Sequence, residues 1–322
     1  MTILLGIDGG GTKTTGRLVD VNSGFLAERT VGPTNPSSRL RKDVENELAL
    51  LIKQLLAATR IPPSDVSACF AGVAGASRPD IQQWLTQTID TMLGSRGVTR
   101  AGHDGVNALF SGTNGHPGIV HIAGTGSLTY GISQQGSEAR AGGWGYLLGD
   151  VGSGFSLGQA AMKAVLDAHD GVGPATALRE KLCQVVGVEA PGPGFIEWVY
   201  DHADVKTRLA SLAPFVFEAA EEGDAVAHRI LSHAGQAMGR AVGAVMTHLN
   251  MTGGASTVPV VLAGSVAKRT EWLVPAASAE LHRTCGGEVS WILPEDPPVA
   301  GAVFAAHNLF YSDGKMLTHL ND

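Results

Sequence analysis

The feature that most constrains this chain is a glycine-rich turn between two short apolar segments near its N-terminus. Residues 7–20 read IDGGGTKTTGRLVD. The segment after the glycines is short and β-branched and runs into an Asn-Ser-Gly turn at 22–24, so it predicts a strand and not a helix. We therefore expect a β-hairpin whose glycine tip lets a phosphate approach backbone N–H groups closely. The simpler alternative is a plain glycine-rich hairpin turn.

Two common phosphate-binding motifs do not match this stretch. A P-loop needs G-x-x-x-x-G-K-[ST] followed by a helix, but after Gly6 and Gly11 the lysine position is taken by Thr12. A dinucleotide fingerprint needs G-x-G-x-x-G, also opening a helix, but Gly9 and Gly11 are followed by Thr14. The strand–turn–strand interpretation therefore remains.

The same design recurs at residues 118–132, where an apolar run, Gly-Thr-Gly-Ser at 124–127 and an alternating run follow one another. Two similar hairpins suggest two similarly built domains, each with one phosphate clamp. A third glycine site, Gly264-Ser265, lies between the apolar run 258–263 and residues 266–273, which have helical spacing. A ligand beyond a strand's carboxyl end, at the start of a helix, is common in α/β folds, although an ordinary strand-to-helix turn is an equal alternative.

Size and composition narrow the class of protein. The 322 residues exceed one usual core, so we expect two domains, 1–117 and 118–322. The net charge of −7 and the lack of a basic stretch argue against nucleic acid or an anionic membrane and favour a small-molecule partner. The three separated cysteines predict no disulfide framework or metal cluster. We see no signal peptide and no apolar run near the roughly 18 residues of a membrane helix, so we expect a cytoplasmic protein.

Three acidic residues are candidates for chemistry. Asp104 follows a probable strand inside Gly-His-Asp-Gly, where it could serve as the base that phosphoryl transfer to an alcohol requires, or could simply cap a loop or helix. Asp8 precedes the first clamp, where an acid beside phosphates calls for a cation such as Mg²⁺. Asp150 lies in the glycine-rich stretch 142–154, which could bind a sugar, and Trp144 there is either part of that site or a core tryptophan.

Taken together, the motifs resemble those of the actin-like ATPase superfamily. Within it the chain is similar to the BadF/BadG/BcrA/BcrD ATPase family, and specifically to its N-acetylglucosamine kinase branch. The matching stretches are IDGGGTKT, GPTNPS at 32–37, HDGVNAL at 103–109, IAGTGS at 122–127, GGWGYLLGDVGSG at 142–154 and LAGSVA at 262–267. They span almost the whole chain, and GGWGYLLGD is the most specific of them.

The resemblance implies a role for each matching residue. Asp104 would be the catalytic base, and Asp8 would hold Mg²⁺. Lys13 would add charge near the phosphates or stay solvated, and Ser211 matches only loosely. The nucleotide-binding positions would be Gly9, Gly10, Gly11, Thr12, Lys13, Gly124, Thr125, Gly126, Ser127, Ser211, Gly264, Ser265 and Lys268. The sugar-binding positions would be Asn35, Asp104, Gly143, Trp144, Gly145 and Asp150.

We therefore expect two actin-like ATPase (ribonuclease H-like) α/β domains flanking a nucleotide and sugar cleft that closes to exclude water. The reaction would transfer the γ-phosphoryl of MgATP to the 6-hydroxyl of N-acetylglucosamine. A glucosamine kinase is the first alternative, and a dehydratase-activating ATPase, which would need clustered cysteines, is the second. Long helices are expected at 155–169 and 224–250, and a C-terminal helix at about 299–312 would pack on the first domain. We also expect a homodimer.

Overall fold

The protein is described from a computed structural model, which covers residues 1–94, 97–252 and 257–311. Its internal contacts form two compact units. Unit 1 comprises Met1–Gly118, Ile132–Glu138 and the described part of Pro294–Asp322, and unit 2 comprises Ile119–Gly131 and Ala139–Leu293. The division into two domains at 117/118 stays a prediction, and residue 312 of the predicted C-terminal helix lies outside the described residues.

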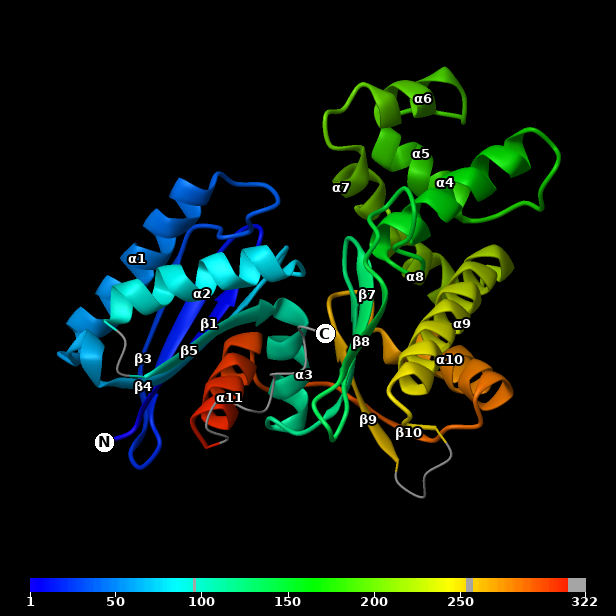
Figure 1. Ribbon diagram of the computed structural model, residues 1–322. Helices are drawn as coiled ribbons and strands as arrows, with labels where there is room; N and C mark the ends of the chain where they lie inside the picture. Colours follow the sequence, from blue (N-terminus) through cyan, green and yellow to red (C-terminus); the bar gives the residue numbers. More distant parts are fainter. Residues whose placement is uncertain (95–96, 253–256, 312–322) are drawn as a thin grey trace. The chain divides into compact units, whose positions relative to one another are not determined.

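Unit 1 is built on a five-stranded sheet of order β3-β2-β1-β4-β5 (Figure 1). The predicted N-terminal hairpin is confirmed, because β1 and β2 pair antiparallel from Ile3↔Asp20 to Gly9↔Thr14. β4 and β5 add in parallel beside β1, so the carboxyl ends of β1, β4 and β5 meet at one edge of the sheet. The strands are β1 (Ile3–Gly9), β2 (Thr14–Asp20), β3 (Gly24–Val31), β4 (Val66–Val73) and β5 (Val98–His103).

Helices cover both faces of this sheet (Figure 1). Alternation along β1 turns Ile3, Leu5 and Ile7 toward the core under α1 and α2, while Gly6 faces α11. A Cβ on Gly6 would lie 2.6 Å from the backbone nitrogen of Val303, so the absence of a side chain lets α11 sit close against the strand. The helices are α1 (Arg41–Thr59), η1 (Pro63–Asp65), α2 (Pro79–Leu93), α3 (Asp104–Thr113) and α11 (Pro298–Tyr311).

Unit 2 carries most of the second sheet, of order β10-β9-β6-β7-β8. Taken from its other end, β8-β7-β6-β9-β10, it repeats the first sheet's order with each strand number raised by five. β6 and β7 are joined by only residues 124–126, and such a short connection requires an antiparallel hairpin. The second predicted hairpin is therefore confirmed, together with the repeated design. The strands are β6 (Gly118–Ala123), β7 (Ser127–Ile132), β8 (Glu138–Gly142), β9 (Val258–Ala263) and β10 (Val289–Ile292).

The helices of unit 2 enclose a large apolar core around α4 and α9. Both long predicted helices are present, with ends that differ by one or two residues from the expected ones. Asp224 caps α9 by accepting hydrogen bonds from the backbone N–H groups of Val226 and Ala227. The helices are α4 (Gly154–His169), α5 (Leu178–Val186), α6 (Pro193–Tyr200), α7 (Val205–Ala210), α8 (Ala213–Glu221), α9 (Ala225–His248) and α10 (Thr270–Thr284).

One predicted helix start was wrong. The spacing of residues 266–273 predicted a helix directly after Gly264-Ser265, but α10 begins only at Thr270. The reason lies in long-range pairing: the backbone N–H groups of Val266 and Ala267 both donate to the carbonyl of Ala123 at the end of β6. This pairing holds the third glycine site against the second hairpin.

Two absences bear on the expectations about membranes and cysteines. Among residues 1–94, 97–252 and 257–311, no helix combines the length and the apolar character needed to cross a bilayer. Cys69, Cys183 and Cys285 are all free thiols, the first two of them buried.

Candidate active site

The tip of the first hairpin is exposed and is held by backbone hydrogen bonds. Gly11, Thr12 and Lys13 are exposed. Below them, the Gly10 N–H donates to the carbonyl of Lys13 at 2.9 Å, and the Gly10 carbonyl accepts from the Thr34 N–H at 3.1 Å. The tip therefore has a defined shape without using its side chains, as expected for a loop that contacts phosphate through its backbone.

Asp8 lies at the carboxyl end of β1, just before this tip. Burial raises the pKa of the Asp8 carboxyl, a hydrogen bond from Asn107 opposes that rise, and the nearby charge of Asp104 adds to it. The two carboxylates are thus close enough to influence each other. A cation between them would relieve both the burial cost and the repulsion.

Asn107 fixes the orientation of Asp8. Its side chain is fully buried, and its Nδ2 lies 2.9 Å from Asp8 Oδ1, 3.0 Å from the Gly72 carbonyl and 3.3 Å from the Ile7 carbonyl. Three acceptors around one nitrogen leave the amide a single sensible orientation, since a flipped amide would bring oxygen against oxygen. Asn107 thereby ties α3 to β1 and β4 at the edge where their carboxyl ends meet.

Asp104 is the first residue of α3, directly after β5, and it does not cap the helix. The N-cap is His103, whose Nδ1 accepts from the Gly105 N–H at 2.9 Å. The same Nδ1 lies 3.0 Å from Asp104 Oδ1. It can accept from Gly105, or, when protonated, donate to Asp104, but it cannot do both. With the cap supplied by His103, the partly exposed Asp104 carboxylate has no capping function in α3.

Asn35 lies beside the first hairpin. Its Oδ1 accepts from the Ser37 N–H at 2.8 Å, and its Nδ2 is 3.9 Å from the position a Cβ would take on Gly11. The structure therefore brings several predicted site residues of unit 1 together at or near the carboxyl edge of the sheet. They are residues 8–13, Asn35 and Asp104.

The second hairpin tip is anchored to the start of α4. The Gly124 carbonyl accepts from the Gly154 N–H at 2.7 Å, and the Thr125 carbonyl accepts from the Phe155 N–H at 3.3 Å. Ser127 Oγ donates to the Val151 carbonyl at 2.9 Å. A Cβ on Gly124 would meet nothing within 4 Å, so this position faces open space. The tip is thus rigidly held and still approachable by a ligand.

A cavity of about 200 Å³ adjoins this tip in unit 2. The predicted residues Gly124, Thr125, Ser211 and Ser265 line it, together with Phe217 and Arg269. The guanidinium of Arg269 lies 4.4 Å from the centre of the Phe217 ring. The cavity therefore offers hydroxyls, a backbone turn and a cation beside an aromatic face. Lys268 is exposed and is not among these lining residues, so its predicted contact with the nucleotide stays a prediction.

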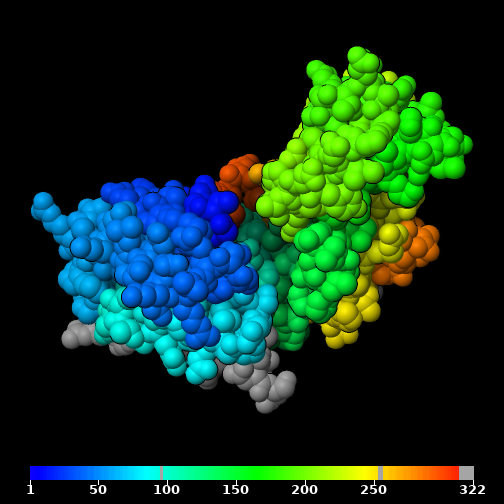
Figure 2. All heavy atoms as spheres, turned by 90° about the horizontal axis from the view of Figure 1, so that it is seen from above, coloured from blue at the N-terminus to red at the C-terminus, as the bar shows by residue number. Residues whose placement is uncertain are grey.

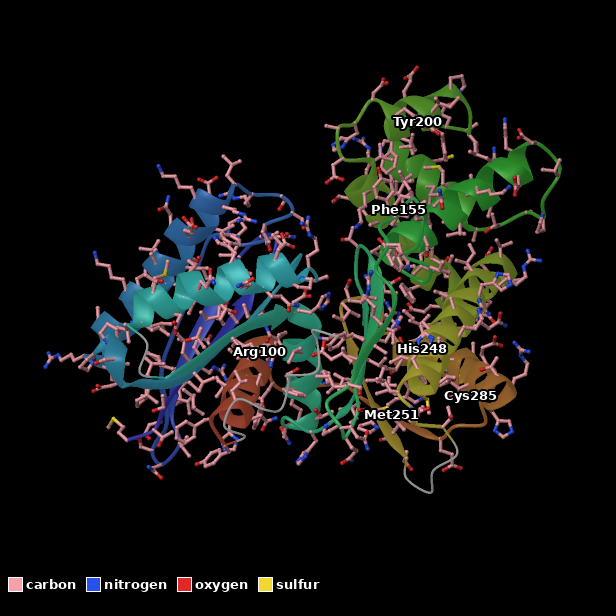
Figure 3. The ribbon with its side chains drawn as sticks, viewed as in Figure 1. Arg100, Phe155, Tyr200, His248, Met251 and Cys285 are labelled. Atoms are coloured by element: carbon pink, nitrogen blue, oxygen red, sulfur yellow. The ribbon has the colours of Figure 1, made fainter. Side chains whose placement is uncertain are left out.

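The glycine-rich stretch 142–154 forms an irregular loop between β8 and α4. Trp144 is 63% exposed, so it is not a core tryptophan, and the Arg140 guanidinium lies 4.2 Å from the centre of its ring. Gly143 and Gly145 have φ angles of 70° and 87°, a backbone conformation that favours glycine. The Tyr146 ring packs edge-on against Phe155, which Figure 3 labels near the start of α4, with ring centres 5.0 Å apart.

Asp150 is the buried acid of this loop. Its side chain is 4% exposed, its φ is 57°, and the Nζ of Lys206 lies 3.5 Å from its Oδ2. It also lines a second cavity, of about 300 Å³, with Ser127, Gly142, His121 and Arg240 among the other lining residues. Trp144, Gly143 and Gly145 do not line this cavity, so the structure joins Asp150 to Ser127 but not to those three; Gly143 and Trp144 are exposed, and Gly145 is half-buried.

Four residues of these sites were missed from the sequence. Asn107 carried a usable signal, because it is a lone amide on the buried face of a short apolar helix, three residues after Asp104. Arg140 also carried a signal, because it is a charged residue in a strand of alternating charged and small residues next to the glycine-rich loop. Lys206 carried none, since it reaches Asp150 from a helix 56 positions later in the chain. Arg269 directly follows the predicted Lys268, but no local pattern indicated which of these two cations would line the cavity.

Comparison with known proteins places this geometry in a family. A model of the BadF/BadG/BcrA/BcrD ATPase family matches residues 5–306. The chain belongs to this family. The predicted resemblance is therefore confirmed over nearly the whole sequence.

Two relatives of this chain are named as sugar kinases. An N-acetylmuramic acid/N-acetylglucosamine kinase of Clostridium acetobutylicum is 33% identical over 273 residues, which cover 85% of this chain and 88% of that protein. The glucosamine kinase GspK of Vibrio cholerae is 25% identical, with 98% and 100% of the two chains covered.

A solved structure confirms the fold class of this family member. The crystal structure of a candidate N-acetylglucosamine kinase from Chromobacterium violaceum matches with a TM-score of 0.67 and 25% identity, over 94% of this chain and 98% of that one. With the repeated strand order of the two sheets, this likeness confirms the predicted α/β fold of the actin-like ATPase superfamily.

Proposed function

We propose that this chain transfers the γ-phosphoryl group of ATP to the 6-hydroxyl of an amino sugar, with N-acetylglucosamine as its preferred acceptor. The observation that carries the proposal is the placement of Asp8 and Asp104, two mutually influencing carboxylates, beside a glycine hairpin tip in unit 1. The kinase names of the relatives over most of the chain support the same reaction.

In unit 1, Asp104 is the proposed base. Its partly exposed carboxylate is free of any capping role, so it can accept the proton of the sugar hydroxyl as that oxygen attacks phosphorus. Residues 9–13 would bind phosphate oxygens through backbone N–H groups, the Thr12 hydroxyl and the Lys13 ammonium. Asn35, beside Gly11, would donate or accept one hydrogen bond with the sugar.

The residues around Asp8 fit a magnesium ion. Mg²⁺ is usually held by one or two carboxylates, with water and substrate phosphates completing its shell. Among the described residues no group of three or more acidic, histidine or cysteine side chains could hold a metal ion, so water and phosphate oxygens would have to supply the other ligands. When bound, the ion would neutralise phosphate charge. Asp8, oriented by Asn107, would hold it, with Asp104 nearby.

In unit 2, we propose that residues 124–127 bind phosphate and that the cavity of about 200 Å³ takes the adenosine. Ser211, Gly264, Ser265 and Lys268 would contact this part of the nucleotide. The loop with Gly143, Trp144, Gly145 and Asp150 would form the sugar wall, with Asp150 accepting hydrogen bonds from ring hydroxyls. Positioning and charge neutralisation would supply most of the rate enhancement.

A coupled assay of ADP release tests the function directly. Purified protein with MgATP should release ADP only when an amino sugar is added, and N-acetylglucosamine should give the highest kcat/KM. The panel should include glucosamine and N-acetylmuramic acid, because relatives carry those names. A higher kcat/KM for glucosamine would promote the second candidate, a glucosamine kinase, which the similarity to GspK favours. An ADP-release rate that is the same with and without each added sugar would contradict the kinase proposal.

Replacing Asp8 by asparagine is expected to lower activity and raise stability at once. The raised pKa of Asp8 means that the folded state disfavours its charged form. The carboxylate therefore destabilises the fold at pH 7, and this cost disappears as the pH falls below the unfolded-state pKa of about 3.9. Asp8→Asn should thus unfold at a higher urea concentration at pH 7 and lose this advantage near pH 3.5, a range that follows from the same pKa.

The activity of Asp8→Asn should fall by about 10²-fold or more, as expected when the charge that holds an essential metal is removed. Asp80→Asn, which changes an exposed acid of the same unit, is the matched control and should alter neither property. Unchanged turnover in Asp8→Asn would contradict the metal-binding role, and a lower stability at pH 7 would contradict the burial argument.

Replacing Asp150 by alanine is expected to weaken sugar binding selectively. A buried hydroxyl that loses its acceptor costs roughly 1–3 kcal/mol, so the KM for sugar should rise about 10-fold or more. Asp150→Asn is the better-tolerated companion, because asparagine accepts the left-handed backbone at this position. The affinity for ATP without sugar should stay nearly unchanged in both variants. An unchanged sugar KM in both would remove Asp150 from the sugar wall.

The proposal also covers the compartment, the oligomeric state and the partners of the protein. We propose that the protein acts in the cytoplasm and forms a homodimer, with no nucleic-acid or membrane partner. Size-exclusion chromatography with light scattering tests the dimer, since a monomer mass near 33.3 kDa at all concentrations would contradict it.

A further inference from the structure

Lys206 places a positive charge beside the buried carboxylate of Asp150. Its Nζ lies 3.5 Å from Asp150 Oδ2, and the Asp150 side chain is 4% exposed while that of Lys206 is 35% exposed. Lys206 comes from α7 and Asp150 from the loop before α4, and Figure 2 shows the yellow-green surface near residue 200 beside the green surface near residue 150. A buried carboxylate without a partner is costly, and the ammonium of Lys206 supplies a partner of opposite charge.

Both charges lie against the second hairpin tip. A Cβ on Gly126 would be 2.7 Å from Asp150 Oδ2 and 3.2 Å from Lys206 Nζ. Asp150 also lines the cavity of about 300 Å³ with Ser127 and Gly142. The pair therefore belongs to the region where we place the sugar and phosphate, and not to a remote surface.

The other charged groups of this region are cationic or paired. Arg140 lies over Trp144, and Arg240, which lines the same cavity, donates to Glu280 at 3.2 Å. Burial lowers the pKa of His121 to about 4, so this lining residue is neutral at pH 7. Among the described residues that line the cavity, Asp150 is the one carboxylate. Lys206 thus offsets the negative charge of the one carboxylate that lines this cavity.

We propose that Lys206 makes this site select the N-acetylated amino sugar over the free amine, an inference that rests on the proposed function. N-acetylglucosamine is neutral, whereas glucosamine carries an ammonium group in its protonated form. With Lys206 present, the cationic sugar gains no net attraction from Asp150, and the neutral sugar loses nothing. Without Lys206, the lone carboxylate would attract the cationic sugar.

This selection does not require contact between the amine and Asp150. Charges act on each other over a Debye length of about 8 Å at physiological salt, and further where water is excluded. Lys206 is accordingly a specificity-determining residue that acts through the charge of Asp150, and its side chain need not touch the sugar.

The test compares kcat/KM for glucosamine and N-acetylglucosamine at pH 7 and saturating ATP. In Lys206→Gln, the ratio of the glucosamine value to the N-acetylglucosamine value should rise about 10-fold or more, equivalent to about 1.4 kcal/mol. Lys206→Arg keeps the charge and should leave the ratio at the wild-type value. Lys163→Gln breaks an exposed lysine–aspartate pair in the same unit and should also leave it unchanged.

A double variant, Asp150→Asn with Lys206→Gln, covers the case in which the lone carboxylate prevents Lys206→Gln from folding. It removes both charges, so its ratio should return to the wild-type value. A raised ratio in the double variant, or an unchanged ratio in folded Lys206→Gln, would overturn the inference while leaving the kinase proposal intact. If the wild-type protein phosphorylates neither sugar, the proposed function itself fails, and this inference falls with it.

Discussion

Replacing Asp104 by asparagine is expected to lower the turnover of sugar by at least about 10²-fold, the usual effect of losing a general base. Asparagine keeps the size of the side chain but cannot accept a proton from the sugar hydroxyl. The change should leave α3 intact, because His103 supplies its cap through the Gly105 N–H. ATP binding, measured by calorimetry without sugar, should persist, since Asp104 has no proposed contact with the nucleotide.

The matched control for this experiment is Asp80→Asn. Asp80 also lies in the first turn of a helix of unit 1, and its carboxylate pairs with exposed Arg78. Asp80→Asn should leave the turnover of sugar at the wild-type level. Near-normal turnover in Asp104→Asn would remove Asp104 from the role of base and leave the capping histidine beside it as the residue to examine next.

Replacing Gly124 by valine is expected to weaken ATP binding by about 10²-fold or more while sparing the fold. A Cβ at this position meets no protein atom within 4 Å, so a larger side chain occupies the open space where a phosphate would lie. Charge-assisted hydrogen bonds are worth roughly 1.5–3 kcal/mol each, so displacing a phosphate from one or two backbone donors accounts for the loss. Calorimetric titration of ATP against the variant measures it.

Gly11→Val tests the first hairpin in the same way, because its nearest neighbour would be Asn35 Nδ2 at 3.9 Å. Gly10 and Gly126 are poorer positions, since added atoms there would crowd Lys13 and Asp150. Gly192→Val is the control: it also faces open space, and its φ of 167° is extended backbone that valine adopts easily. Unchanged ATP affinity in Gly124→Val or Gly11→Val would show that the hairpin in question binds no phosphate.

The elements that the sequence predicted well are those set by local pattern. The two hairpins follow from β-branched runs around glycine turns, and α4 and α9 follow from apolar spacing over 16 and 24 residues. The position of Asp104 at a strand end was also local, because β5 ends at His103. The exposed Trp144 shows the limit of this approach, since composition alone left a core tryptophan possible.

The remaining features depend on pairings between distant parts of the chain. Asn107 contacts groups 35 to 100 residues away, and Lys206 reaches Asp150 across 56 positions. The late start of α10 likewise results from the Ala123 carbonyl, which lies more than 140 residues earlier. Local spacing carries no information about which partner a backbone N–H or a lysine will find, so these parts of the site needed the fold.

The position of α11 in the chain has a consequence for biosynthesis. The face of the first sheet that carries Leu4, Gly6 and Phe70 is covered by a helix that begins only at Pro298, whereas the sheet itself is complete at His103. At roughly 5–20 residues per second, a ribosome needs about 10–40 s to translate the intervening residues. During that interval the nascent first unit exposes apolar surface that its own late helix will cover. Premature termination of translation anywhere in the second unit would therefore destabilise the first unit as well, because the truncated product would lack α11 and leave that apolar face exposed.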